Sequence, residues 1–314
     1  MQLIRPDISI DFIGRRKVAF LLSGLMILIS LGLLATRGLN FGIDFTGGSL
    51  VEVQFATPPQ ISDVRKALVP AGYGQAIIQQ FGAPNEILIR VQNRDGEESS
   101  VISSEILRAL SASFDASSVE MRRVEYVGPQ VGDELTQAGI MAVLIAMLAI
   151  LVYVTVRFEF RFALGADVAL LHDITIVIGL FSLTGKEFTL PVVAALLTVI
   201  GYSLNDTIVV FDRIRENFDA NRRRKRQLDE VTVTNSSVNQ TLARTLMTSF
   251  TTLLVVFALF LLGGEVIHDF AFALIAGIVV GTYSSIFVAS PVMLSLKGLF
   301  VSDEAEIRAM EARP

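Results

Sequence analysis

An acidic side chain inside a long apolar run is the feature of this sequence best suited to chemistry. Asp206 follows eighteen uncharged residues, Phe188–Asn205, and lies seven residues before Arg213. A charge at the centre of a bilayer costs at least about 2.5–3.5 kcal/mol, so such a residue needs a compensating role. The low dielectric disfavours the ionised carboxylate, which suits Asp206 to taking up and releasing protons. We interpret Asp206 as a proton-relay residue; the alternative is a polar contact that joins helices.

Arg244 begins the next apolar run and has two interpretations. Hydroxyl side chains surround it at helical spacing, at Thr241, Thr245, Thr248 and Thr252. Such a polar stripe lines a hydrated path or joins helices through hydrogen bonds. Arg244 would then face the Asp206 carboxylate and favour its ionised form in one conformation. Alternatively, Arg244 is a boundary residue whose long side chain extends to the membrane surface.

Asn205, His172 and Asp173 are further polar candidates inside apolar runs. Asn205 neighbours Asp206 and is assigned with it to the proton relay. Asp173 is a second candidate relay carboxyl near the middle of its run. Adjacent helical side chains point about 100° apart, so His172 is expected to meet a different partner, and its role stays open. Asp269 and its neighbours, between two apolar runs, are expected to be solvated.

The elements that must position these residues are transmembrane helices, each about 20 residues long. Apolar runs predict six of them, at 18–36, 134–156, 162–185, 188–212, 241–264 and 267–296. The first is expected to be a retained span. A cleaved signal peptide is the alternative, but the run is too long and no cleavage site follows it.

Composition supports a polytopic α-helical membrane protein. The chain is 52% hydrophobic and only 18% charged, which argues against a soluble enzyme and against a disordered chain. It has no cysteine, which excludes disulfides, thiolate catalysis and zinc–cysteine sites. The net charge of −5 gives no global basic field that would attract nucleic acid.

Basic residues predict the orientation of the spans. They gather in residues 1–17, in a basic loop at 213–240 and in the tail at 297–314, all on one side of the membrane. Because basic residues mark the cytoplasmic side, both termini are expected there and residues 37–133 outside. The cluster Arg222–Arg226 is interpreted as a topology signal rather than a nucleic-acid patch, since it lies between two spans.

Residues 37–133 form a separate unit whose pattern is that of a small water-soluble domain. Hydrophobic periods predict strands at 49–55, 76–80, 86–91 and 119–127, with helices at 60–69 and 98–114. The order β-α-β-β-α-β predicts a ferredoxin-like α+β domain. It contains no His and no Gly-rich phosphate loop, so we expect a binding or lever module. Gly47-Gly48 is expected to let the chain turn.

Five motifs are distinctive enough to suggest a family. They are Phe41–Gly48, Val127–Gly132, Gly201–Asn217, Thr241–Thr248 and Gly281–Ser285. Together they span nearly the whole chain, and the sequence resembles the SecF branch of the SecD/SecF family within the RND superfamily. The first motif lies just outside the first span and contains Phe41, Gly42, Asp44, Gly47 and Gly48.

The resemblance implies a subunit of the Sec protein-export machinery in the bacterial inner membrane. It implies pairing with SecD, association with the SecYEG channel, SecA, YajC and YidC, contact with the translocating polypeptide, and use of the proton-motive force. Asp206 matches the family's intramembrane relay aspartate, and Arg244 matches the basic residue expected to work with it. The outer domain matches an extracytoplasmic domain that moves during the cycle. No enzymatic activity, cofactor or metal is implied beyond the coupling ion, a proton or alternatively sodium.

Two other functions stay open at the level of sequence. One is a self-contained RND-like exporter of small molecules or lipids, which normally has more spans and larger outer domains. The other is a passive scaffold that only stabilises a partner. The scaffold predicts that loss of the Asp206 charge is tolerated.

Overall fold

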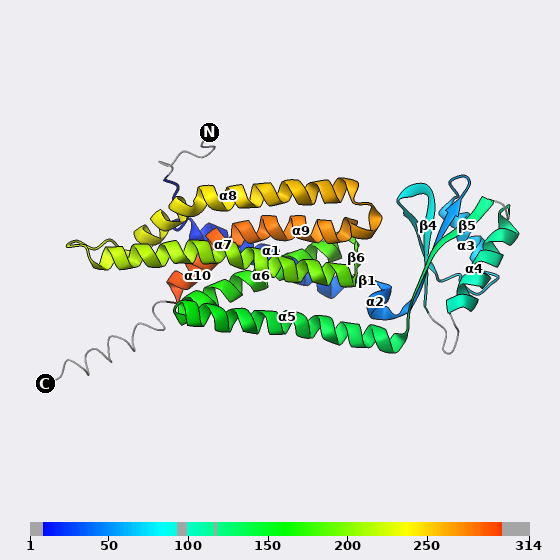
Figure 1. The fold of residues 1–314 in the computed structure, drawn as a ribbon, viewed down its shortest axis with the longest axis horizontal. Coiled ribbons are helices and arrows are strands. Elements are labelled where there is room, and N and C mark those ends of the chain that lie inside the picture. Colours follow the sequence, from blue (N-terminus) through cyan, green and yellow to red (C-terminus); the bar gives the residue numbers. More distant parts are fainter. Residues whose placement is uncertain (1–8, 93–98, 116–117, 297–314) are drawn as a thin grey trace.

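The protein is an elongated helix bundle with a small α/β domain at one end (Figure 1). The computed structural model describes residues 9–92, 99–115 and 118–296, so the predicted tail and the first eight residues lie outside the described part. Within that part, six helices are long and apolar enough to cross a membrane. They are α1 (Arg16–Arg37), α5 (Pro129–Arg157), α6 (Phe160–Thr184), α7 (Leu190–Arg222), α8 (Glu230–Leu262) and a sixth that joins α9 (Glu265–Ser284), a π-helical segment (Ser285–Ala289) and α10 (Ser290–Ser295). The prediction of six spanning helices is confirmed.

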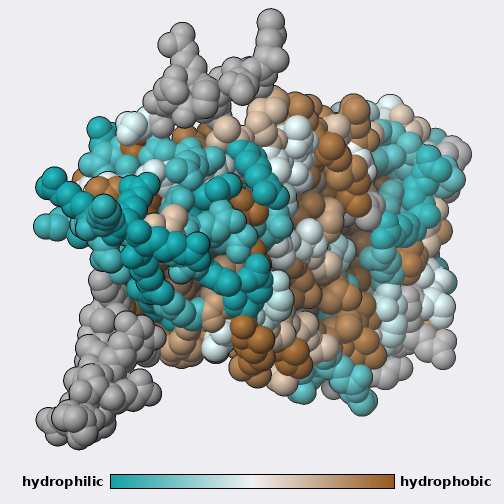
Figure 2. Space-filling view, turned by 60° about the vertical axis from the view of Figure 1, so that its left-hand side comes forward, coloured by the Kyte–Doolittle hydropathy of each residue, from teal (hydrophilic) through white to brown (hydrophobic). Residues whose placement is uncertain are grey.

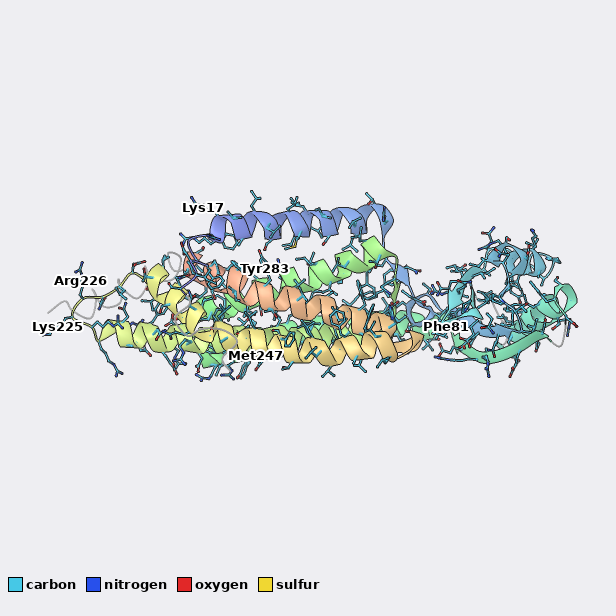
Figure 3. All side chains as sticks on the ribbon, turned by 90° about the horizontal axis from the view of Figure 1, so that it is seen from above. Lys17, Phe81, Lys225, Arg226, Met247 and Tyr283 are labelled. Carbon is cyan, nitrogen blue, oxygen red and sulfur yellow. The ribbon has the colours of Figure 1, made fainter. Side chains whose placement is uncertain are left out.

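The bundle has an apolar girdle between two polar ends. Figure 2 shows a hydrophobic band around the helices, with hydrophilic residues on either side of it. Lys17, Lys225 and Arg226 lie at the end opposite Phe81, which belongs to the α/β domain (Figure 3). A girdle of this kind is what a bilayer requires of a spanning bundle, because lipid tails contact the exposed apolar side chains.

Three helices form the inside of the bundle and three lie outside it. The apolar windows of α6, α7 and the sixth span are 61%, 56% and 61% buried, whereas those of α1, α5 and α8 are 17%, 11% and 17% buried. Helix α1 packs against α6, and α8 packs against α7 and α9. The residues that the sequence singled out on α6 and α7 therefore lie on inner helices, and Arg244 lies on an outer one.

The segment 213–240 was predicted as a loop, and this prediction is wrong for most of its length. Helix α7 continues to Arg222 and α8 already begins at Glu230, so only a short turn separates them. Charged residues mark the end of the hydrocarbon, not the end of the helix. Outside the membrane α7 can continue because Arg and Glu are good helix formers in water, and α8 can begin early because Asp229 caps its first turn.

The α/β domain contains an antiparallel sheet covered by two helices. Its elements are β2 (Gly48–Phe55), α3 (Ile61–Leu68), β3 (Ile77–Phe81), β4 (Ala83–Val91), α4 (Ser99–Ser113) and β5 (Val119–Val127). The predicted β-α-β-β-α-β order is therefore present, and the strands lie in the order β3-β4-β2-β5. The alternation expected in β2 is observed, since Val51, Val53 and Phe55 are almost fully buried in the domain core. This core is separate from the apolar clusters of the helix bundle.

Short elements that the sequence did not predict connect the domain to the bundle. Strand β1 (Asn40–Phe41) pairs in parallel with β6 (Glu187–Phe188), which lies between α6 and α7. The one-turn helix α2 (Ile43–Thr46) packs on α5. These elements place the motif Phe41–Gly48, which follows the first span, against the start of α7.

The two glycines that follow α2 allow this segment to lie close to β4 and α5. Gly47 and Gly48 have φ of 65° and 140°, so the predicted turn is confirmed. A Cβ on Gly48 would lie 2.7 Å from the carbonyl oxygen of Val91, and one on Gly132 would lie 3.0 Å from the backbone nitrogen of Gly47. A side chain on Gly132 would push the domain away from α5, whereas one on Gly48 would push β2 away from β4.

Candidate functional site

Asp206 lies on α7 inside the bundle, where three helices meet. Its side chain is 2% exposed. Two hydroxyl groups of α8 donate to it, Thr248 Oγ1 to Oδ1 at 3.5 Å and Ser249 Oγ to Oδ2 at 3.4 Å. Ser249 Oγ is also 2.7 Å from Thr282 Oγ1 of α9. These contacts to the carboxylate are long for hydrogen bonds to an oxygen acceptor, so Asp206 is buried but loosely held.

Asn205, next to Asp206 on α7, and Arg244, on the neighbouring helix α8, are both exposed. Arg244 lies on α8 one turn before Thr248, whose hydroxyl oxygen is 3.1 Å from the Arg244 carbonyl oxygen, an acceptor that competes with Asp206 for its proton. Among the described residues, no salt bridge joins Arg244 to Asp206, so that pairing stays a prediction. Asn205 is exposed on α7. The structure thus places a guanidinium and an amide on the outside of the bundle, beside the buried acid.

The threonine stripe on α8 faces the bundle interior at its start. Thr241 and Thr245 are buried, while Thr248 and Thr252 are half-buried. Thr252 Oγ1 donates to the carbonyl oxygen of Thr248 at 2.9 Å, a bond within the helix. The buried hydroxyl oxygen of Thr245 has no partner within the described part of the chain. At Thr245 the stripe therefore offers a buried hydroxyl group that is available to form a further hydrogen bond next to α7.

His172 and Asp173 belong to a second, separate polar cluster. Both are buried, and His172 Nδ1 lies 2.9 Å from Asp173 Oδ1. Ser203 Oγ of α7 and Ser284 Oγ of α9 donate to Asp173 Oδ2 at 2.6 and 2.8 Å. The sequence analysis expected the two neighbours to have different partners and missed that they bind one another. Asp173 thus joins α6, α7 and α9, and Ser203 precedes Asp206 by about one turn.

The imidazole of His172 is fixed by an aromatic neighbour. Its ring is stacked on that of Tyr283, with centroids 6.0 Å apart. The Tyr283 hydroxyl donates to the Ala19 carbonyl oxygen of α1 at 3.1 Å and is 3.1 Å from Ser23 Oγ (Figure 3 labels Tyr283). His172 Nε2 is buried and has no partner within the described residues. The cluster therefore reaches all three inner helices and α1.

A third group of charged residues, which sequence reasoning missed, lies where the α/β domain meets the bundle. Arg90 of β4 forms an ion pair with Glu187 of β6. Lys186 Nζ donates to Asp269 Oδ1 at 2.6 Å, so the expectation that Asp269 is merely solvated is wrong. Asp44 Oδ2 accepts from the backbone N–H of Leu190 at 2.7 Å, at the first residue of α7. These contacts join residues 83 to 146 positions apart and leave no local signal in the sequence.

The chemistry available in the bundle is that of proton binding and hydrogen bonding. Within the described ranges, no three His, Asp or Glu side chains gather to hold a metal ion. Each of the two carboxyl oxygens of Asp206 can accept from one hydroxyl group of α8. Hydroxyl groups both donate and accept, so they can serve the ionised and the protonated carboxyl alike.

Two family models match the chain. The model described as "Protein export membrane protein SecD/SecF, C-terminal" matches residues 106–298, and the "SecD/SecF GG Motif" matches residues 32–59. The second match contains Gly47, which lies against Pro129 of α5, and Gly48, which lies against Val91 of β4.

Proteins named "Protein translocase subunit SecF" are similar over most of the chain. The one from Magnetococcus marinus is 56% identical over 273 residues, which are 86% of this chain and 86% of that protein. Those from Vibrio alginolyticus and Escherichia coli O157:H7 are 50% and 43% identical, over 87% and 83% of this chain and 85% and 80% of theirs.

Solved structures of SecDF are similar in fold. The crystal structure of SecDF from Thermus thermophilus, described as a translocon-associated membrane protein, superposes with a TM-score of 0.83 at 38% identity. SecDF in a super-membrane-facing form gives a TM-score of 0.70 at 38% identity. They cover 94% and 98% of this chain, whereas this chain covers only 40% and 41% of theirs.

Proposed function

Because the chain belongs to the SecD/SecF family of protein-export membrane proteins, we propose that it is the SecF-type subunit of a bacterial Sec translocase and uses an ion gradient to promote polypeptide export. Its similarity to the translocase subunits extends over both the helix bundle and the motif that leads into the α/β domain. It is a transport subunit rather than an enzyme. The basic end of the bundle lies in the cytoplasm and the α/β domain lies outside the inner membrane.

The observation that supports ion coupling is the way Asp206 is held. It is 2% exposed, lies on an inner helix and receives only long hydrogen bonds from two hydroxyl groups. A proton can therefore bind to or leave Asp206 without breaking a tight network. One proton that crosses 100 mV releases about 2.3 kcal/mol, which biases a two-state equilibrium about fiftyfold.

We propose that the charge of Asp206 controls the contact between α7 and α8. The ionised carboxylate attracts Arg244 and the hydroxyls of α8, and protonation removes the attraction to Arg244. Helix α7 then shifts relative to α8. Since the first residue of α7 is bound by Asp44, the shift reaches the base of the α/β domain. The moving domain pulls on an emerging polypeptide or prevents it from sliding back.

A SecD-type partner is proposed to cover the exposed polar groups beside Asp206. Arg244 and Asn205 are exposed at the level of the apolar girdle, and polar groups that face lipid are costly. The SecDF structures are more than twice as long as this chain, which leaves room in them for such a partner. Association with SecYEG, SecA, YajC and YidC is proposed from family membership alone.

The proposal is tested by replacing Asp206 with Asn in the full chain, co-expressed with its partner. Export of a model preprotein into inverted membrane vesicles is measured with and without a proton gradient, together with proton conductance. We expect Asp206→Asn to abolish the stimulation of export by the gradient. Asp212→Asn, at a half-exposed position farther along α7, is the matched control and should retain it.

The outcomes separate the competing functions. Unchanged stimulation in Asp206→Asn would contradict ion coupling and favour a passive scaffold. Replacing the proton gradient by a sodium gradient identifies the coupling ion. Proton flux that responds to drugs or lipids, in a preparation without any Sec partner, would instead favour a small-molecule exporter.

A further inference from the structure

The α/β domain is fastened to the helix bundle through a compact polar joint. We define the joint as Asn40, Asp44, Arg90, Lys186, Glu187 and Asp269. Its backbone part is the parallel pair of β1 and β6, continued by a bond from Gly42 N–H to the carbonyl oxygen of Phe188 at 2.9 Å. The Asn40 side-chain amide also donates to the Gly185 carbonyl oxygen at 3.1 Å. The joint thus connects the segment after α1 to the turn that precedes α7.

Arg90 is the member of the joint that comes from the sheet of the domain. It is 9% exposed and lies in β4, paired with Leu50 of β2. Its Nη1 donates to the Phe41 carbonyl oxygen at 2.8 Å, and its Nη2 binds Glu187. Arg90 therefore connects the rigid sheet directly to β1 and β6. Its buried Nε has no partner among the described residues, so the ion pair dominates its interactions.

Glu187 also connects Arg90 to the helices α9 and α7. Its backbone N–H donates to Asp269 Oδ2 at 3.1 Å, at the start of the sixth span, and Lys186 binds the other oxygen of Asp269. Three residues later α7 begins at Leu190, whose N–H is bound by Asp44. A continuous chain of contacts thus leads from the sheet to the helix that bears Asp206.

Because the Arg90–Glu187 ion pair is buried, its energy depends strongly on how the sheet is placed relative to the helices. Burial raises the pKa of Glu187, and Arg90 opposes this through its charge and its hydrogen bond, while Asp269 and Asp44 raise the pKa further. A buried ion pair adds little stability compared with apolar residues of similar size, but a separated pair leaves two unpaired charges. The contact therefore favours one relative placement of sheet and helices over neighbouring ones.

Space beside the joint allows the domain to tilt once this contact is released. A cleft of about 730 Å³ opens between the segment Leu39–Phe41 and the edge of the sheet at Ala76, and Arg90 lines it. The domain therefore does not rest on the bundle over a continuous packed face. Its placement depends on the joint, on the apolar contact of Ile43 in α2 with Leu50 and Leu88 of the sheet, and on the close approach of Gly47 to Gly132 of α5.

From these contacts we infer that the Arg90–Glu187 ion pair is the coupling contact that transmits a shift of α7 to the α/β domain. Breaking it would separate ion movement in the bundle from polypeptide export. Arg90 and Glu187 are positioning residues, since neither touches Asp206. The inference rests on the proposed function, because it assumes that a charge change at Asp206 drives export.

The test compares export with ion conductance in the full complex. We expect Glu187→Gln and Arg90→Gln each to lower gradient-driven export at least fivefold, while proton conductance stays within twofold of the wild-type value. The double variant R90E/E187R restores the opposite charges and should recover part of the export. Arg123→Gln, which breaks the exposed Arg123–Glu125 pair on β5, is the matched control and should leave both readouts unchanged.

A distance measurement shows whether the pair fixes the domain, even if export is affected for another reason. The chain contains no cysteine, so spin labels can be attached at Glu120→Cys in the domain and Leu262→Cys at the end of α8, both exposed. We expect a narrow distance distribution in the wild type and a broader one in Glu187→Gln. An equally narrow distribution in both would overturn the inference.

The two proposals fail in different ways. If Asp206→Asn abolishes gradient-driven export while Glu187→Gln exports normally, the coupling contact is refuted and the proposed function stands. If Asp206→Asn exports normally, the proposed function fails, and the coupling inference fails with it. Parallel loss of export and conductance in Glu187→Gln would also overturn the inference, because it would show damage to the bundle itself.

Discussion

Asp173 and Asp206 are both buried inside the bundle, and the contacts that hold them differ in kind. Asp173 is bound by His172 and two serines at 2.6 to 2.9 Å. Asp206 receives two hydroxyl contacts at 3.4 and 3.5 Å. One carboxyl is enclosed by a complete set of short hydrogen bonds, and the other is buried without being tightly bound.

The difference separates a structural role from a switching role. A group that must gain and lose charge cannot be locked in one state by strong partners, because every change would then break them. Asp173 fastens α6 to α7 and α9, and His172 and Tyr283 extend the fastening to α1. We interpret this cluster as a fixed frame against which the contact between α7 and α8 moves. Asp173 can take part in the proton relay, as the sequence predicts, only if this frame opens.

The largest expected effect on the free energy of unfolding comes from removing Asp173, the centre of this fixed frame. Asp173→Ala should destabilise the bundle by about 3 kcal/mol, because three side-chain hydrogen bonds worth roughly 1 kcal/mol each are lost. Chemical unfolding of the purified protein in detergent measures this change. Asp212→Ala, at a half-exposed position on α7, is the control and should change the free energy of unfolding little. Wild-type stability in Asp173→Ala would contradict a fastening role.

A matched pair of serine variants sharpens the comparison at the level of single bonds. Ser203→Ala removes a 2.6 Å bond to Asp173, and Ser249→Ala removes a 3.4 Å bond to Asp206. We expect a loss of about 1–2 kcal/mol in the first and of about 0.6 kcal/mol or less in the second. The same unfolding assay measures both. Equal losses would show that bond length does not distinguish the two acids.

Asp206→Asn should have a still smaller effect on stability in spite of its effect on export. The amide has nearly the same shape and can still accept from Thr248 or Ser249, so we expect a change of at most about 0.5 kcal/mol. Unfolding and gradient-driven export are measured on the same preparations. A variant that loses export and stability together would break the comparison, since Asp206 would then be a second structural acid.

The parts of this structure that the sequence predicts are those with long or regular patterns. Spanning helices need about 20 apolar residues, so charge-free runs locate them and mark Asp206 as an anomaly. Alternation locates β2, because Val51, Val53 and Phe55 enter the domain core while Glu52 and Gln54 on the other face stay half-buried. Leu50 on that other face is buried as well, by packing against Ile43 of α2, which the alternation did not predict. The identity of the buried acid was thus predictable, whereas the geometry around it was not.

The joint was unpredictable because its elements are too short for any period. Strands β1 and β6 have two residues each, and α2 has four. Its side-chain contacts connect residues far apart in the chain, such as Lys186 and Asp269. The helical extensions beyond the membrane escape prediction for another reason: a charged residue marks the end of the apolar run but not the end of the helix, and Asp229, outside the membrane, is the residue that caps α8.

Asp229 provides the smallest expected effect and a reference acid outside the membrane. It is exposed at the N-cap of α8, where the Thr232 hydroxyl and N–H donate to its carboxylate at 2.6 and 3.1 Å. These hydrogen bonds lower the pKa of Asp229. The folded state therefore binds its proton less tightly than the unfolded state does. The stabilisation is complete above the unfolded pKa, about 3.9, and is lost as the pH falls through the lowered folded value.

Two variants at Asp229 separate the effect of its charge from the effect of capping. Asp229→Ala should lower the Tm of the bundle slightly at about pH 6, and the difference from wild type should shrink below about pH 4. Asp229→Asn retains an N-cap oxygen but does not titrate, so its Tm should lack this pH-dependent component. Because Asp229 is exposed and outside the girdle, gradient-driven export should be unchanged in both variants. A loss of export as large as that of Asp206→Asn would show that a carboxylate need not be buried to matter for coupling. The difference between the hydrogen bonds of Asp173 and those of Asp206 would then not explain which acid couples export to the gradient.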